Sequence, residues 1–164
     1  DRNNDGVFNA EDLDPGEAAV LAIVTDSSGA KTVWRQVTTT AEIWHGDGEG
    51  DLTRYGVWLP LVDPESMAQL YTTAVFEGPV EGITAPGSFT RASTNWDLAA
   101  LERGGSNAST PGTVEISEVS GGLASGFVAE ASGAMQIIDY LEQAPTGDFV
   151  CVQAMAFREI PLEP

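Results

Sequence analysis

The sequence predicts a mainly β protein: an antiparallel β-sandwich, or a barrel-like meander, with one or two short helices. Three observations support this fold class. Segments rich in β-branched and aromatic residues recur along the chain, several of them alternate apolar and polar residues, and clusters of Gly, Pro, Asn, Asp and Ser separate them. With 164 residues, 42% of them hydrophobic, the chain is long enough to bury a core without disulfides. We expect a calcium-binding loop at 1–14 and a single β domain at 15–164.

The first strands are expected within residues 17–62. The run 18–24 is apolar throughout and is followed by the turn Asp26-Ser27-Ser28-Gly29. This pattern favours a strand buried on both faces over a short helix. An acidic, glycine-rich loop at 46–51 precedes a returning strand at 55–62.

The segment 32–45 is rich in β-branched and aromatic residues, which predicts the longest strand of the protein. Alternation places its side chains on two faces. One face would carry Val33, Val37, Ala41 and Ile43, and the other Trp34, Thr38, Thr40 and Trp44.

Both short helices are expected in the middle of the chain. Asp63 can cap a helix over 63–70 that has Pro64 in its first turn. A strand is predicted to follow at 71–76. The second helix is predicted over 95–103, where Gly104-Gly105 would end it.

The last third of the chain carries the clearest strand patterns, at 113–116 and 124–131. The segment 149–157 is apolar at both parities, which predicts a central strand with Cys151 in the core beside Phe149, Met155 and Phe157. The order Gly-Thr-Val-Glu-Ile, Ser-Gly-Phe-Val and Ala-Phe-Arg-Glu-Ile-Pro resembles the C-terminal halves of bacterial envelope lipoprotein β domains of unknown function.

The N-terminal twelve residues place oxygen atoms at the positions that a calcium loop requires. Gly6 would make the sharp turn, and Phe8 is expected to point into the domain. The predicted ligands are the side chains of Asp1, Asn3, Asp5, Asn9 and Asp12 and the main-chain carbonyl of Val7. Carboxylates held this close repel one another by roughly 1 kcal/mol per pair in water, and a divalent cation reverses that repulsion. The sequence therefore predicts Ca²⁺ as a cofactor; the alternative is a solvated, Asn/Asp-rich terminus.

The order Asp-x-Asn-x-Asp-Gly-x-Phe-Asn-x-x-Asp resembles the EF-hand-type calcium loops of dockerins and of other secreted bacterial modules. Dockerins follow the loop with a helix and repeat the unit, whereas Asp14-Pro15-Gly16 ends any helix at once and no second full copy follows. Cohesin binding is therefore not implied. A single loop of this kind is expected to fasten the N-terminus to the domain rather than to act as a calcium switch.

The charge balance limits the partners. Acidic residues number 25 and basic residues 7, so the net charge of −18 disfavours nucleic acid and anionic membrane surfaces. No apolar run approaches the roughly 20 residues that a membrane-spanning helix needs, so membrane insertion is not expected. Because a calcium loop of ordinary affinity needs the millimolar Ca²⁺ found outside cells, we expect an exported protein of the extracellular space or cell envelope.

Two further groups of residues are candidate sites. The carboxylates of Asp47, Glu49 and Asp51 alternate and could face one ion, but the rest of a calcium loop is missing and the sequence favours a solvated hairpin loop. The rings of Trp44, Tyr55 and Trp58 flank this acidic loop and could stack against a sugar, or they could belong to the core.

Catalytic patterns are weak in this sequence. His45 is the single histidine, and the sequence has no Gly-x-Ser-x-Gly elbow to supply a nucleophile for it. The first hypothesis is therefore a non-enzymatic structural or adhesive module, which could be one subunit of a larger assembly that involves self-association or other envelope proteins. The second is a carbohydrate-binding module with a glycan ligand, and the third is a small hydrolase based on His45 or on paired carboxylates.

Overall fold

The structure is a computed structural model that describes residues 2, 4–5, 8–46, 52–63 and 66–163. These residues form an 11-stranded antiparallel sheet and two single-turn 3-10 helices, η1 (Ala10–Asp12) and η2 (Ala99–Leu101). The strands are β1 (Ala18–Thr25), β2 (Lys31–Thr38), β3 (Glu42–His45), β4 (Leu52–Val62), β5 (Gln69–Pro79), β6 (Gly87–Leu98), β7 (Arg103–Asn107), β8 (Thr113–Ser120), β9 (Leu123–Ala129), β10 (Met135–Asp139) and β11 (Ala144–Pro161). The predicted mainly β, antiparallel fold is confirmed.

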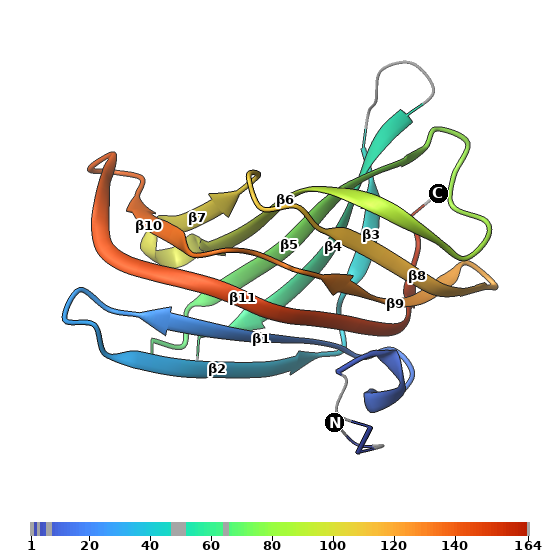
Figure 1. Cartoon of the computed structure of the whole chain (residues 1–164), viewed down its shortest axis with the longest axis horizontal. Coiled ribbons are helices and arrows are strands. Elements are labelled where there is room, and N and C mark those ends of the chain that lie inside the picture. Colours follow the sequence, from blue (N-terminus) through green and yellow to red (C-terminus); the bar gives the residue numbers. More distant parts are fainter. Residues whose placement is uncertain (1, 3, 6–7, 47–51, 64–65, 164) are drawn as a thin grey trace.

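The long strands β6 and β11 are connected to each other twice. The main path of the sheet runs β2-β1-β11-β10-β7-β6-β5-β4-β3, so that β10 and β7 form one connection. A second branch, β9 and β8, joins the other half of β11 to the first residues of β6. Figure 1 shows these two branches toward opposite ends of β11. Between β6 and β11 the sheet therefore splits into two branches, one made of β7 and β10 and the other of β8 and β9.

Arg91 lies where the two branches meet, and its side chain is only 4% exposed. Its guanidinium donates to Thr94 Oγ1 at 3.1 Å, to the carbonyl of Asn107 at 3.3 Å and to the carbonyl of Thr110. Thr94 in turn donates to the carbonyl of Ala131. Burial lowers the pKa of Arg91, while the charge of Glu130 opposes that change. One buried arginine therefore supplies donors to main-chain carbonyls at the division of the sheet.

The sheet curls until its two edges approach each other. On the β3 side, Ile43 forms a parallel bridge with Leu162, and Glu163 N donates to Ile43 O at 2.9 Å. On the β2 side, the Gln36 side-chain amide bonds to both the N–H and the carbonyl of Val62 in β4. Figure 1 shows β11 crossing in front of β4 and β5. The core lies between these layers.

The predicted strand over 32–45 is wrong, because the chain breaks at 39–41 into β2 and β3. β2 pairs with β1, whereas β3 pairs with β4 in the other layer, so the chain must cross between layers at this point. The crossing also reverses the alternation: even-numbered residues of β2 face the core, whereas Ile43, an odd-numbered residue, does so in β3. Trp34 is buried against Trp96 with ring centroids 4.7 Å apart, while Val33 and Val37 face solvent. The longest strand is β11, Ala144–Pro161.

The predicted helices over 63–70 and 95–103 are replaced by strands and turns. Met67 N donates to Asp63 O at 2.8 Å in a turn, and β5 begins at Gln69. In the second segment β6 continues to Leu98 and only the turn η2 follows. Pairing across the sheet buries Leu70 and Trp96, and this burial outweighs the local preference for helix.

The prediction that 149–157 is a central strand of the sheet is confirmed, because it lies in β11, which has β1 on one side and β10 and β9 on the other. Cys151 and Phe149, however, do not lie in the core. Cys151 is half-buried and Phe149 is 40% exposed, whereas Met155 and Phe157 are buried. The register with β1 shifts between Leu21 and Ala22, where a bulge in β11 adds one residue. Because a one-residue shift exchanges the two faces, residues before and after the bulge have opposite parity.

Candidate functional site

The described part of the N-terminal segment is held together by its own polar side chains. Asn9 caps η1 by accepting from Glu11 N at 2.7 Å, and Asp12 accepts from Asn9 N at 3.0 Å. Asp12 Oδ1 also accepts from Arg2 N, which joins position 2 of the predicted loop to position 12. Asp12 is buried, Asn9 is half-buried and Asp5 is exposed.

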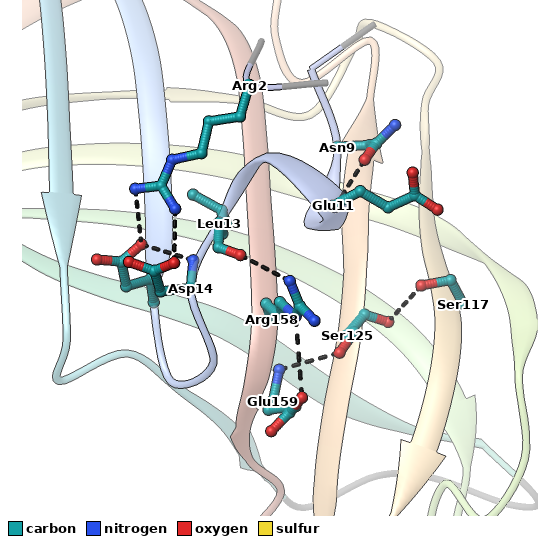
Figure 2. Close-up of polar contacts among 10 residues, drawn as sticks. Arg2, Asn9, Glu11, Leu13, Asp14, Ser117, Ser125, Arg158 and Glu159 are labelled. Atoms are coloured by element: carbon teal, nitrogen blue, oxygen red, sulfur yellow. Dashed lines mark hydrogen bonds and ion pairs between the residues drawn. The ribbon is translucent and has the colours of Figure 1, made fainter. Parts of the chain in front are cut away.

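The same segment packs on the outside of the sheet. Leu13 forms a small apolar cluster with Ala19 and Ala156, and Phe8 and Phe127 pack against it. Arg158 of β11 donates to the carbonyl of Leu13 at 2.9 Å, as Figure 2 shows. Phe8 therefore contacts the domain, as the sequence predicts.

Calcium binding stays a prediction. Of its six proposed ligands, Asp1, Asn3 and Val7 lie outside the described residues. Within the described part of the chain, no group of three or more His, Cys, Asp or Glu side chains is arranged to hold a metal ion. The candidate second site, Asp47, Glu49 and Asp51, lies entirely outside the described residues.

The three aromatic residues proposed to stack against a sugar do not form one platform. Tyr55 is 1% exposed and donates its hydroxyl to the carbonyl of Pro79 at 2.6 Å, so it belongs to the core. Burial also raises the pKa of its phenol. Trp44 lies across Gly56 of the neighbouring strand, where a Cβ would overlap the indole. Trp58 alone of the three lines a groove described below.

His45 is placed at the end of β3 by its pairing with Tyr55. Its imidazole stacks on the buried Tyr55 ring, with centroids 4.5 Å apart and planes 8° apart. Its main-chain N–H donates to Glu163 Oε2 at 3.4 Å. These contacts give His45 a packing role at the edge of the core.

A groove of about 550 Å³ follows the seam between β2 and β4. Trp58 and Tyr71 stack on each other beside it, with ring centroids 5.4 Å apart and planes 19° apart. Hydroxyl and amide side chains from β2, the 39–41 loop and β5 also line it: Gln36, Thr38, Thr39, Thr40 and Gln69. The remaining lining residues are apolar: Val37, Pro60, Leu61 and Val62. None of the described lining residues carries a charge. The alternation of buried and exposed residues along β5 could have predicted from the sequence that Tyr71 lies on the outer face. It could not have predicted that Tyr71 lies at the same groove as Gln36.

The second candidate surface is the outer face of β2, β1 and β11, here called the β2–β1–β11 face. Its residues form rows across the paired strands: Val37, Ala19 and Ala156; Arg35, Leu21 and Ala154; Val33, Ile23 and Cys151; Lys31, Thr25 and Phe149. Val33 is 57%, Val37 56% and Phe149 40% exposed. The face contains no acidic residue among these rows. Sequence reasoning missed it because it placed Phe149 and Cys151 in the core and put Val33 on the same face as Ile43, which is buried.

No protein-family model, curated protein sequence or solved structure matches the chain. The fold and these two surfaces define it as an antiparallel β module with an apolar outer face and an uncharged aromatic groove. None of the helices in the described ranges has the length and apolar character needed to cross a membrane.

Proposed function

We propose that this chain is an exported, non-catalytic structural or adhesive module that assembles with further copies of itself through the β2–β1–β11 face. The observation that carries the proposal is the exposure of Val33, Val37 and Phe149 on the part of this face that the N-terminal segment leaves uncovered, since Phe8 and Leu13 pack on Ala19 and Ala156. Apolar patches of this kind mark protein interaction sites more often than isolated exposed residues do.

The size of the face suits a modest dimer. β1 has 8 residues, which corresponds to a length of about 26 Å at ~3.3 Å per residue. Together with β2, β11 and one flanking strand, at a spacing of ~4.8 Å, the face covers about 500 Å². Two such faces would bury at most about 1,000 Å², the lower limit for a specific interface, because Phe8 and Leu13 already cover the end of the face at Ala19 and Ala156.

Electrostatics favour contact at this face over contact elsewhere. Two copies that each carry a net charge of −18 repel each other over most of their surfaces. The rows of the face contain Lys31 and Arg35 and no carboxylate. Contact through these rows therefore brings no carboxylate of the rows themselves into opposition.

Replacement of Val33 and Phe149 by glutamate, V33E with F149E, should convert the self-associated wild type to monomer. Four buried carboxylates would face one another in a symmetric dimer, so we expect the dissociation constant to rise by about 100-fold or more. Sedimentation equilibrium at about 10 to 100 µM protein measures this change directly. Association of the wild type should strengthen between about 0.05 and 0.5 M NaCl because salt screens the repulsion between copies.

Leu141→Glu is the matched control, because Leu141 is 75% exposed and lies in the turn after β10, outside the face. This variant should associate as the wild type does. A wild type that stays monomeric at about 100 µM, or equal weakening by L141E, contradicts the proposal.

We propose in addition that Ca²⁺ fastens the N-terminal segment to the sheet. The side chains of Asp5, Asn9 and Asp12 carry oxygen atoms that can coordinate a cation, and oxygen is the ligand that Ca²⁺ prefers. The packing of Phe8 and Leu13 on β1 and β11 supports a structural role, because an ordered loop would keep these residues in place. The bound ion would neutralise the carboxylates of the loop.

Calcium should raise the melting temperature of the wild type, and EDTA should reverse the change. At about 100 times the dissociation constant, the ion adds about 2.7 kcal/mol to the free energy of unfolding. Asp5→Ala should abolish most of this response, whereas Glu11→Ala should keep it, because Glu11 is an exposed acid at a position that is not a ligand. Differential scanning calorimetry with Ca²⁺, Mg²⁺ or EDTA gives the comparison. Equal responses of the two variants, or none in the wild type, would remove calcium from the proposal.

A further inference from the structure

The groove between β2 and β4 has the form of a ligand site. Its volume of about 550 Å³ lies within the range of small-molecule and oligomer sites. It exists because β3 pairs with β4 only as far as Glu42–Trp58, so β4 continues from Leu59 to Val62 without β3 beside it. β2 approaches this stretch through Gln36 instead. The floor of the groove is therefore fixed by strands and not by flexible loops.

The aromatic pair provides apolar ring surface at the groove, although one face of each ring is turned toward the other. Trp58 and Tyr71 come from paired strands, and both are half-buried and border the groove. The Tyr71 hydroxyl donates to Gln69 Oε1 at 2.9 Å, which fixes the orientation of the ring. Pairs of amphipathic aromatic rings held in this way offer large contact area at low entropic cost.

The polar groups are of the kind that pair with hydroxyls. Gln36 is held by two hydrogen bonds to Val62, and its amide keeps one N–H and one lone pair for a ligand. The amide nitrogen of Gln69 is not used by Tyr71. The hydroxyls of Thr38 and Thr40 hydrogen-bond to each other at 3.2 Å at the groove, and each hydroxyl can still make a further bond. Amides and hydroxyls can both donate to and accept from sugar hydroxyls.

Charge narrows the ligand class further. Acidic residues number 25 in this chain, yet the described lining residues include no ionised side chain. An anionic ligand would find no cation there and would meet the repulsion of a molecule with a net charge of −18. We propose that the groove binds a neutral polysaccharide chain, with sugar rings packed on Trp58 and Tyr71 and hydroxyls bonded to Gln36, Gln69 and the threonines.

Affinity electrophoresis tests the proposal with soluble probes: hydroxyethylcellulose, xylan, laminarin and starch as neutral polysaccharides, and alginate as an anionic one. At least one neutral probe should retard the wild type, and alginate should not. Trp58→Ala and Tyr71→Ala should each weaken binding about tenfold or more, which corresponds to the loss of one central aromatic contact. Gln69→Ala should also weaken binding, and Gln69 is exposed, so this change leaves the core intact.

Tyr140→Ala is the matched control for loss of an aromatic ring. Tyr140 is 48% exposed and donates to Asp97 Oδ1 at 2.7 Å, outside the groove. Burial and the Asp97 carboxylate raise the pKa of Tyr140 to about 12, so this phenol is neutral at the pH of the assay. The control should bind as the wild type does.

Polysaccharide binding and self-association can fail separately. The association variant V33E with F149E alters neither Trp58 nor any other groove residue, so it should be retarded as the wild type is. Lack of retardation by every neutral probe overturns the inference. So does retardation that persists unchanged in W58A, Y71A and Q69A, because binding would then lie elsewhere.

Discussion

Replacing Arg91 with methionine should lower the free energy of unfolding by about 3 kcal/mol or more, because buried acceptors would lose their donors. The guanidinium donates to the carbonyls of Asn107 and Thr110 and to the hydroxyl of Thr94. Methionine fills much of the same volume and donates to none of them. Each buried polar group left without a partner costs about 1 to 3 kcal/mol. Urea unfolding followed by circular dichroism measures the change.

Arg54→Met is the control for this prediction, because Arg54 is exposed on β4. It should change the stability by less than about 0.5 kcal/mol. One donor of the Arg91 side chain is unsatisfied, because its Nε is buried and has no hydrogen-bond acceptor. If methionine at position 91 were as stable as the wild type, the cost of burying the guanidinium would balance its hydrogen bonds, and the role of Arg91 at the division of the sheet would be refuted.

Gly126→Ala should destabilise the protein by about 3 kcal/mol, since the strands around it leave no space for a methyl group. A Cβ at this position would overlap the carbonyl oxygen of Glu115 in β8 and lie 2.9 Å from Phe157 Cζ. Gly126 pairs with both Ile116 and Phe157, so a shift on one side compresses the other. Thermal unfolding and the intensity of the β-sheet signal in circular dichroism report the effect.

Gly87→Ala provides the matched comparison in the neighbouring pairing of β6 with β8. A Cβ there would meet Phe89 at 3.4 and 3.5 Å, which is ordinary van der Waals contact. Its stability should be unchanged or raised by up to about 1 kcal/mol, because alanine restricts the unfolded chain more than glycine does. Equal destabilisation by the two changes would show that loss of strand glycine, and not the close approach at Gly126, is responsible.

The strands were the most predictable part of this fold. The apolar run 18–24 and the alternating segments 55–62 and 113–116 all lie in strands, because side-chain burial and strand propensity agree there. The two predicted helices failed for the opposite reason. Capping residues such as Asp63 favour a helix locally, but pairing with β4 and β6 buries the following residues more effectively.

Faces were less predictable than strands. A bulge in β11 reverses parity after Val152, and the crossing at 39–41 reverses it after Thr38. Neither change has a sequence signal such as Gly or Pro at the point where it occurs. For this reason Cys151 was expected in the core but lies half-buried on the outer face, and Val33 and Ile43, which were expected on one face, lie on opposite faces.

The aromatic residues illustrate how far sequence reasoning reached into the candidate site. Tyr55 and Trp58 are three residues apart on one strand, so alternation requires them to face opposite sides of the sheet. Trp58 lines a groove, so its proposed stacking role stays a prediction, whereas Tyr55 is a core residue. Tyr71 and Gln36 could not be joined to Trp58, since their contact depends on the register of β5 and on the closure of the sheet.

The pairing of β1 with β11 has a mechanical consequence. Ala18 at the start of β1 lies opposite Phe157 near the end of β11, so tension applied to the chain before β1 and after β11 pulls on adjacent ends of an antiparallel pair. The hydrogen bonds between the strands would then be loaded one after another, as in a zipper, and not all at once in shear. Once the bonds of Leu162 with Gly122 and of Glu163 with Ile43 have opened, the next bonds to carry the load are those of Arg158 with Gly16, Glu17 and Leu13. Resistance of the module to stretching therefore depends on how firmly the N-terminal segment is fastened around Arg158.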